Sequence, residues 1–127
     1  MLSVLPRDWN VEKSTIICDE PSSAETLSMT VRDGDIIIAG TDGLWANVYP
    51  HEIESWFNNE EEYALSRKSV SYLSRFICER AIRKSSDPFV DDDQIPFVGE
   101  AQRFGVYWSG GQVDDITVLV SRVRSSS

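Results

Sequence analysis

Two aspartates stand where short apolar strands meet glycines, and they are the residues of this chain best suited to chemistry. Asp42 follows the strand-like run 35–40 and precedes Gly43, while Asp114 lies between a pair of glycines and the apolar run 116–120. Glycine lets a backbone approach a ligand closely, and strand-end carboxylates hold hard cations. The two aspartates are distant in the sequence, so only a folded sheet can bring them together. They predict a metal site, or one half of it.

A purely structural interpretation of each motif is the alternative. Asp before Gly is a common turn pair, and the doublet Asp114–Asp115 could simply be solvated. The combination favours a functional role, because both aspartates adjoin apolar strands that are expected inside one sheet. Carboxylates at the ends of neighbouring buried strands repel each other unless a cation or protons intervene.

The strands that must position these aspartates follow from the hydrophobic pattern. Period-two alternation and continuous apolar runs predict strands over 14–18, 26–31, 35–40 and 116–123. The pair Asp33–Gly34 predicts a hairpin turn between the second and third of them. The strand over 35–40 is expected to be covered on both faces, because its apolar run is continuous.

Two helices are predicted between the two aspartates. Pro50 suits a first helical turn, and apolar residues at helical spacing predict a helix over 50–57. A longer helix is predicted over 66–84, with Ser66 as its N-cap and cationic side chains near its C-terminal end. The remaining segments are expected to be an irregular lead-in, a surface excursion and a helical turn, at 1–13, 85–99 and 98–104.

Length and composition limit the classes of function. The 127 residues are expected to form a single domain, 1–127, which is large enough for a hydrophobic core. A net charge of −9 argues against binding to nucleic acid or to an anionic membrane surface. No apolar run approaches the ~20 residues of a membrane span, and the N-terminal residues lack the features of a signal peptide. Cys18 and Cys78 form no CxxC pair, so an intracellular, reducing compartment is expected.

In combination, the two motifs resemble those of a known family. A strand entering T-D-G-L-W at 41–45, two helices, and then G-G-x-x-D-D-I-T-V at 110–118 are similar to the C-terminal half of type 2C metal-dependent Ser/Thr protein phosphatases, the PPM family. The resemblance is greatest to the branch with mitochondrial and plant members, in which a segment like 87–102 also precedes the second motif. It covers residues 16–123.

The resemblance implies both a fold and a site. The fold is α+β, part of a four-layer αββα sandwich in which an antiparallel sheet packs against helices, with two Mg²⁺ or Mn²⁺ ions at one end and without the N-terminal half in this chain. Asp42 and Asp114 match the two C-terminal aspartate ligands of one ion. Gly43 lets the loop pack close to the metal, and Asp115 is expected to orient water or neighbouring amides. A metal-bound water attacks the phosphorus of a phosphoserine or phosphothreonine protein, so no catalytic side chain is expected in this chain.

The chain also departs from the family pattern. The D-G-H-G-G motif, whose aspartate bridges both ions, has no match here, and neither has the phosphate-binding arginine. Ala46 stands where an aspartate usually follows D-G-L-W. The chain is therefore expected to be a C-terminal portion of such a phosphatase that binds metal weakly and is inactive alone. The alternatives are a phosphatase-like pseudoenzyme or interaction module that binds or regulates a partner, and an unrelated α+β domain.

An uncovered sheet face is a further expectation. Four strands and two helices make about one layer of a two-layer sandwich, which leaves an apolar face without cover. Such faces drive association. The chain is therefore expected to self-associate or to pack against another chain.

Other conspicuous residues are interpreted as structural. His51 follows Pro50 at a helix start, so a capping or surface role is expected. The acidic run 91–93 lacks the spacing of a calcium loop and is expected to be solvated. Core or domain packing is expected for four aromatic residues, which are Trp45, Trp56, Phe57 and Trp108.

Overall fold

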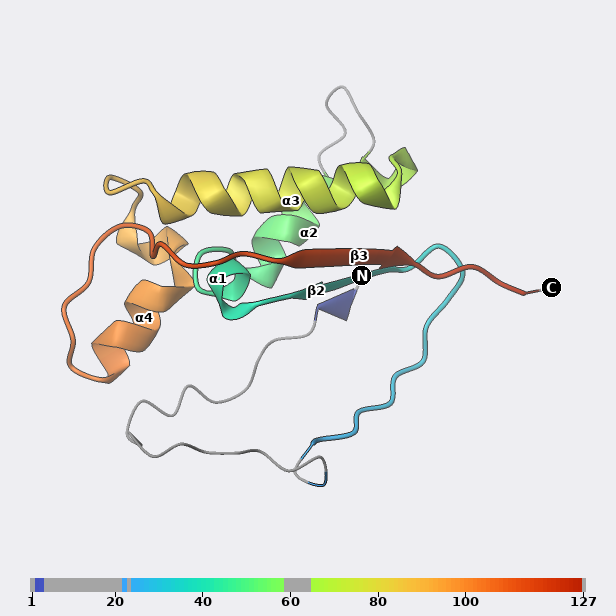
Figure 1. The fold of residues 1–127 in the computed structure, drawn as a ribbon, viewed down its shortest axis with the longest axis horizontal. Coiled ribbons are helices and arrows are strands. Elements are labelled where there is room, and N and C mark those ends of the chain that lie inside the picture. The colour runs from blue at the N-terminus through green and yellow to red at the C-terminus, as the bar shows by residue number, and fades with distance from the viewer. Residues whose placement is uncertain (1, 4–21, 23, 59–64, 127) are drawn as a thin grey trace.

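A small β-sheet forms the centre of the fold (Figure 1). The computed structural model describes residues 2–3, 22, 24–58 and 65–126. Within these residues the sheet has three strands, in the order β1 (Leu2–Ser3), β2 (Ile36–Gly40) and β3 (Val118–Arg122). β1 runs parallel to the central β2, and β3 runs antiparallel to it. The expected antiparallel arrangement therefore holds for β2 and β3, and the short β1 makes the described sheet a mixed one. Residues 2–3, which were expected to be irregular, thus belong to the sheet.

The turn predicted over residues 32–35 leads into β2. Gly34 has a φ of 89°, in the left-handed region that favours glycine. The amide of Asp35 donates to the carbonyl of Arg32 at 3.1 Å, and the Asp35 carboxylate accepts the amide of Arg32 at 2.8 Å. The Gly34 amide also donates to the carbonyl of Val123 at 2.8 Å. The turn is therefore closed on itself and attached to the end of β3.

The two faces of β2 differ in burial. Ile36 and Ile38 are buried, whereas Ile37 and Ala39 on the opposite face are only partly buried. The prediction that this strand is covered on both faces is therefore wrong. The physical reason is that the described helices pack on one side of the sheet, so successive residues of the strand meet different surroundings.

Helices follow β2 in the sequence and cover one face of the sheet. They are α1 (Asp42–Trp45), α2 (Pro50–Asn58), α3 (Val70–Ser85) and α4 (Pro96–Arg103), with 3₁₀ turns at Leu65–Arg67 and Asp92–Gln94. Figure 1 shows α3 running along the sheet and α4 near α1, beyond the end of the strands. The fold is α+β, as the sequence predicts. In the described part of the chain, no helix is both long and apolar enough to cross a membrane.

The long helix α3 is amphipathic. Leu73, Ile77 and Ala81 are fully buried and recur one turn apart, on a helix that packs against β3. The Oγ atom of Ser69 accepts a backbone amide of the first turn at 3.2 Å, so Ser69 is the N-cap. The prediction that Ser66 caps this helix is wrong, because Ser66 lies in the preceding 3₁₀ turn.

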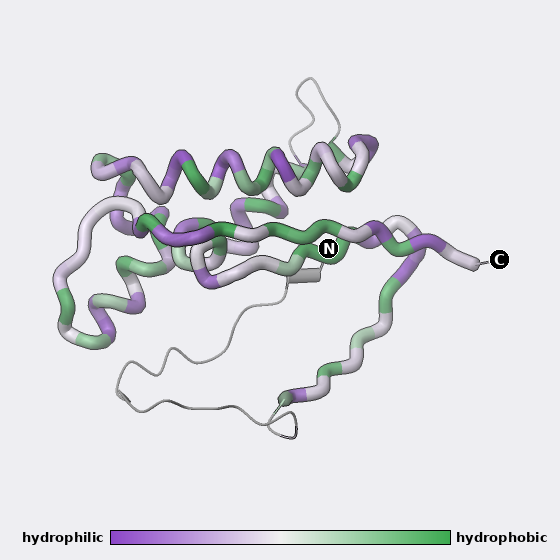
Figure 2. The backbone as a smooth tube through the Cα atoms, viewed as in Figure 1, coloured by the Kyte–Doolittle hydropathy of each residue, from purple (hydrophilic) through white to green (hydrophobic). Residues whose placement is uncertain are grey.

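The hydrophobic core lies between the sheet and its helices. Its buried members are Ile36, Ile38, Leu44, Trp45, Val48, Ile53, Leu65, Leu73, Ile77 and Ala81. Figure 2 shows hydrophobic residues along the paired strands and at intervals along α3. Burying one such aliphatic side chain contributes about 1.5–3 kcal/mol. The core therefore fixes α1 and the end of β2, where the first of the two aspartates lies.

The strand predicted over residues 26–31 is not formed. This segment is exposed and lies outside the sheet, and Figure 1 shows it leading away from the strands. An alternating sequence becomes a strand only when a neighbour accepts its backbone hydrogen bonds, and no described strand pairs with it. Of the predicted hairpin, the described residues therefore form only the turn over 32–35 and the strand that follows it. The strand predicted over 14–18 lies outside the described residues.

Candidate metal-binding site

Asp42 lies where β2 ends abruptly. Thr41 is extended, with φ −74° and ψ 171°, and is the N-cap of α1, so Asp42 becomes the first helical residue. The Nε1 atom of Trp45 donates to the carbonyl of Gly40 at 3.1 Å. A Cβ atom on Gly40 would overlap the side chain of Leu44. The chain thus passes from strand to helix within one residue, and Asp42 stays exposed at the end of the sheet.

Thr41 joins this end of β2 to the segment that precedes β3. Its amide donates to the carbonyl of Thr117 at 3.1 Å, and its hydroxyl accepts the Thr117 amide at 3.0 Å. The same hydroxyl donates to the carbonyl of Asp115 at 3.2 Å. The residue before Asp42 therefore holds the backbone that follows Asp114.

Gly43 brings the two segments into close contact. A Cβ atom at this position would overlap the carbonyl oxygen of Asp115 and lie 3.1 Å from a side-chain carbon of Ile116. Only glycine leaves room for that carbonyl. Gly43 thus packs tightly against the backbone of Asp115, and its expected role in letting the loop approach a metal stays a prediction.

Asp42 and Asp114 thus belong to segments that meet at one end of the sheet. Both side chains are exposed, and Asp114 Oδ1 accepts the amide of Asp115 at 2.7 Å. Carboxylate oxygens are hard donors, which suit Mg²⁺ or Mn²⁺. Among the described residues, however, no group of three or more His, Cys, Asp or Glu side chains is placed to hold an ion. The carboxylate oxygens of the two aspartates are of the donor type that such a metal prefers, but the described part of the chain supplies an incomplete set of ligands.

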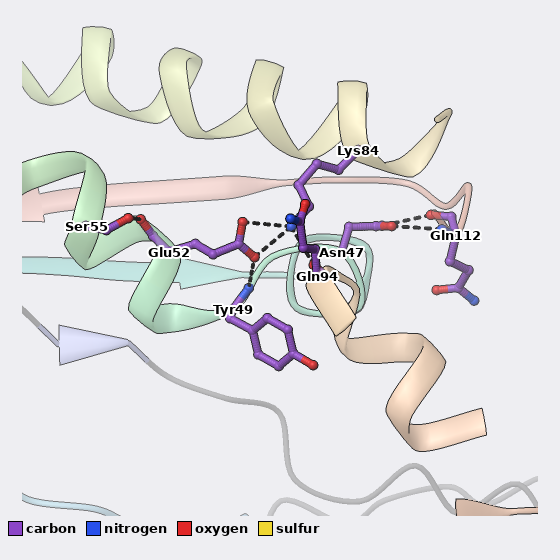
Figure 3. Close-up of polar contacts among 7 residues, drawn as sticks. All are labelled: Asn47, Tyr49, Glu52, Ser55, Lys84, Gln94 and Gln112. Carbon is purple, nitrogen blue, oxygen red and sulfur yellow. Dashed lines mark hydrogen bonds and ion pairs between the residues drawn. The ribbon is translucent and has the colours of Figure 1, made fainter. Parts of the chain in front are cut away.

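Asn47 was not singled out by the sequence, yet it connects both segments. Its side chain is fully buried. Nδ2 donates to the carbonyls of Gly43 and Gln112, each at 2.8 Å, and Oδ1 accepts the Gln112 amide at 2.8 Å. Figure 3 shows the contact with Gln112. In the sequence, the available signal was a single polar side chain, an amide, in the otherwise apolar run 43–48. The structure buries every residue of this run.

The two glycines before Asp114 let its loop pass the end of α3. Gly110 has a φ of 79°, and a Cβ atom on Gly111 would overlap the backbone carbonyl of Lys84. The Gly111 amide donates to the carbonyl of Asp87 at 3.0 Å. The loop therefore packs directly on the backbone at the C-terminal end of α3.

An ion pair fixes that end of α3. Lys84 Nζ lies 2.6 and 2.7 Å from the two carboxylate oxygens of Glu52 in α2, and it donates to the carbonyl of Gln94 at 2.6 Å. Glu52 also accepts the amide of Tyr49 at 3.0 Å. Figure 3 shows these contacts converging between α2, α3 and the residues before α4. The ion pair thus attaches to α2 the end of α3 on whose backbone the Asp114 loop rests.

Other residues with possible chemistry lie apart from this end of the sheet or are structural. His51 is exposed and stacks on Tyr49, with 4.9 Å between ring centroids. The acidic run 91–93 is exposed, as predicted. Ala46 is buried, and its carbonyl accepts the amide of Phe97 in α4 at 2.9 Å.

Three of the four aromatic residues pack in or against the core, as predicted. Trp45 belongs to the core, and Trp56 and Phe57 pack against it. Trp108 is partly exposed and meets Phe97 edge-on, with 5.1 Å between centroids. Of the two cysteines, Cys78 is free and partly buried, and Cys18 lies outside the described residues.

Comparison with curated proteins finds several relatives with similar sequences. The chain is 36% identical over 109 residues to probable protein phosphatase 2C 80 of Arabidopsis thaliana, covering 85% of the chain and 25% of that protein. It is 32% identical over 126 residues to the human protein phosphatase PTC7 homolog, covering 96% and 38% respectively. It is 31% identical over 127 residues to the mitochondrial protein phosphatase 2C homolog 7 of Saccharomyces cerevisiae, covering 96% and 36%. The chain thus spans a quarter to two fifths of these relatives.

Comparison with solved structures supports the same fold. The X-ray structure of the photosystem II phosphatase PBCP superposes with a TM-score of 0.65 at 24% identity, covering 87% of this chain and 44% of that chain. No family model matches the chain. The structural similarity concerns the fold, and the sequence similarity concerns the segments that carry both aspartates.

Proposed function

Because this chain corresponds to the C-terminal portion of a type 2C protein phosphatase, we propose that it supplies part of a metal-dependent active site. The reaction is hydrolysis of a phosphoserine or phosphothreonine in a protein substrate. Asp42 and Asp114 would hold one Mg²⁺ or Mn²⁺ ion. When bound, such ions lower the pKa of a coordinated water and stabilise the charge that develops at phosphorus.

The observation that carries the proposal is the junction at Thr41 and Gly43. Thr41 is hydrogen-bonded to both Asp115 and Thr117, and Gly43 accommodates the carbonyl of Asp115. The junction therefore holds two exposed carboxylates on one end of the sheet. We assign Asp115 the role of orienting water or neighbouring amides beside the ion.

The chain is proposed to be inactive by itself. Two carboxylates leave most positions of a six-coordinate Mg²⁺ or Mn²⁺ ion to other ligands, and the described residues contain no group of three or more His, Cys, Asp or Glu side chains placed to hold an ion. The remaining ligands would come from the part of the relatives that this chain does not cover. Weak metal binding and no turnover are expected until that part is supplied.

A second candidate is an interaction module without catalytic activity. Its support is Ala46, which places a buried methyl group after the D-G-L-W motif, and an outer sheet face on which Leu119 is 66% exposed. A module of this kind would bind a partner through that face and would not need Asp42 or Asp114.

A chimaera separates the two candidates. This chain would replace the aligned C-terminal portion of the human PTC7 homolog, and hydrolysis of a small aryl phosphate would be measured with Mn²⁺. The proposal expects an inactive isolated chain, an active chimaera, and loss of that activity in Asp42→Asn and Asp114→Asn. Glu54→Gln, which changes an exposed carboxylate of α2, is the matched control and should keep the activity.

Each contrary result has a distinct meaning. Activity in the isolated chain would overturn the proposal that it is one part of a site. A folded but inactive chimaera would favour the interaction module. Full activity in Asp114→Asn would remove the ligand assignment while leaving the phosphatase proposal in place.

A further inference from the structure

Asn47 has a buried polar side chain whose hydrogen bonds run to the backbone of its own segment, at Gly43, and to the backbone of a distant segment, at Gln112. It is 0% exposed. An amide in such a place must satisfy its donors and acceptor, because an unpaired buried polar group is costly. Its partners are the carbonyl of Gly43 and both backbone groups of Gln112. The side chain thus pairs with Gln112 as a neighbouring strand would.

No other common side chain reproduces this pattern. One Nδ2 donates to two carbonyls while Oδ1 accepts an amide, all at 2.8 Å. Aspartate has the acceptor but no donor, and it would place a charge beside two carbonyl oxygens. Leucine has neither. The position therefore requires both the amide nitrogen and the carbonyl oxygen of an asparagine side chain.

The partners of Asn47 adjoin the two proposed metal ligands. Gly43 directly follows Asp42, and Gln112 stands two residues before Asp114. The Thr41 hydrogen bonds attach the far side of the same loop, at Asp115 and Thr117. The Asp114 segment is thus held on both sides of the aspartate, by Thr41 after it and by Asn47 before it.

We propose that Asn47 is a positioning residue that sets the spacing between Asp42 and Asp114 for a shared divalent cation. This inference rests on the function proposed above. Asn47 acts through the backbones of Gly43 and Gln112 and is itself buried away from solvent. Removing it releases the Gly110–Asp114 loop from α1, while Thr41 still holds the residues that follow.

Amide hydrogen exchange of the 127-residue chain tests the release of the loop. In Asn47→Ala, the Gln112 amide should exchange about tenfold faster relative to the Ile77 amide in the core of α3, because one hydrogen bond is lost locally. Asn47→Ser is the second variant, with a smaller cavity and a side chain too short to reach both segments. Ser69→Ala, which removes the N-cap of α3, is the control: it lowers overall stability and so speeds exchange of the Ile77 amide, but it should leave local exchange of the Gln112 amide at the wild-type rate.

Paramagnetic broadening by Mn²⁺ alone tests the effect on the metal site. In the wild-type chain, Mn²⁺ should broaden the amide signals of Gly43 and Asp115, and Asp114→Ala should abolish this. Asn47→Ala should raise the Mn²⁺ concentration needed for half-maximal broadening by about tenfold, the range seen when residues that orient ligands are removed. Ser69→Ala should leave that concentration unchanged.

The outcomes distinguish this inference from the function on which it rests. Wild-type-like Mn²⁺ broadening or Gln112 exchange in Asn47→Ala and Asn47→Ser would overturn the role of Asn47 and leave the proposed function standing. Absence of broadening at Gly43 and Asp115 in the wild-type chain, or broadening that survives Asp114→Ala, would overturn the proposed ligand pair and, with it, this inference.

Discussion

The carbonyl oxygen of Asp115 occupies the space that a side chain on Gly43 would need. Gly43 lies in α1 directly after β2, and Asp115 lies just before β3, so this contact sets how closely the two segments meet. Glycine is required here for steric reasons and not for its backbone conformation, because the φ of Gly43 does not lie in the left-handed region.

Gly43→Ala should therefore destabilise the chain. Overpacking of a tight contact costs about 1–3 kcal/mol, and urea unfolding followed by circular dichroism would measure it. Gly99→Ala is the matched control, because Gly99 lies in α4 with nothing within 4 Å of its Cβ position. That substitution should stabilise the chain by up to about 1 kcal/mol through helix propensity. Equal stability of the two variants would show that the Gly43 contact is not tight in solution.

Replacing Lys84 by methionine should loosen the support beneath the Asp114 loop. Its side chain and that of Glu52 are only 15% and 23% exposed, so removing the ammonium group leaves a largely buried carboxylate that, within the described residues, keeps the Tyr49 amide as its donor. A loss of about 1–3 kcal/mol in the free energy of unfolding is expected. Urea unfolding of Lys84→Met, Glu52→Gln and the double variant would give the coupling energy between the two side chains.

The pair Arg103–Glu100 provides the control for this measurement. Its side chains are 77% and 47% exposed and three residues apart on α4. Arg103→Met should change stability by less than about 0.5 kcal/mol, because exposed pairs are screened by water. If Lys84→Met proved as mild as Arg103→Met, the ion pair would have no supporting role.

Gln112→Met should stabilise the chain. Among the described side chains, Gln112 Oε1 is a buried acceptor without a hydrogen-bond partner. Such a group costs about 1–3 kcal/mol, and methionine has a similar volume without the polar atoms. The backbone contacts with Asn47 do not involve this side chain and should persist. A higher thermal midpoint in differential scanning calorimetry is expected, and a lower one would mean that the side chain finds a partner in solution.

The sequence predicted the α+β fold and the main elements because their signals are local. The apolar run of β2, the turn at Asp33–Gly34 and the spacing of Leu73, Ile77 and Ala81 all specify structure through near neighbours. The observed N-cap, Ser69, lies three residues after Ser66, and both serines precede the apolar periodicity that begins at Val70, so composition alone does not separate them.

What the sequence did not predict depends on distant partners. The segment 26–31 carries a strand pattern but has no strand beside it in the described residues, so it stays outside the sheet. Asn47 has no motif of its own, and its role is visible only once Gln112 lies against it. The importance of Lys84 likewise follows from contacts to Glu52 and to the Gly111 loop, which are made by the folded chain.

The outer face of the sheet leads to a prediction about association. Leu119 in β3 pairs with Ala39 in β2, and both lie on the face opposite the core residue Ile38 and Val120, which packs against the core. Exposed apolar sheet faces favour association, so the isolated chain should form dimers or larger species at micromolar concentration. Leu119→Lys should shift it towards the monomer in sedimentation velocity, since burying an ammonium group in such an interface is unfavourable. Ile82→Lys, at an exposed position of α3, is the control and should leave the distribution unchanged. A wild-type chain that stays monomeric at every concentration measured would contradict the prediction that this face drives association.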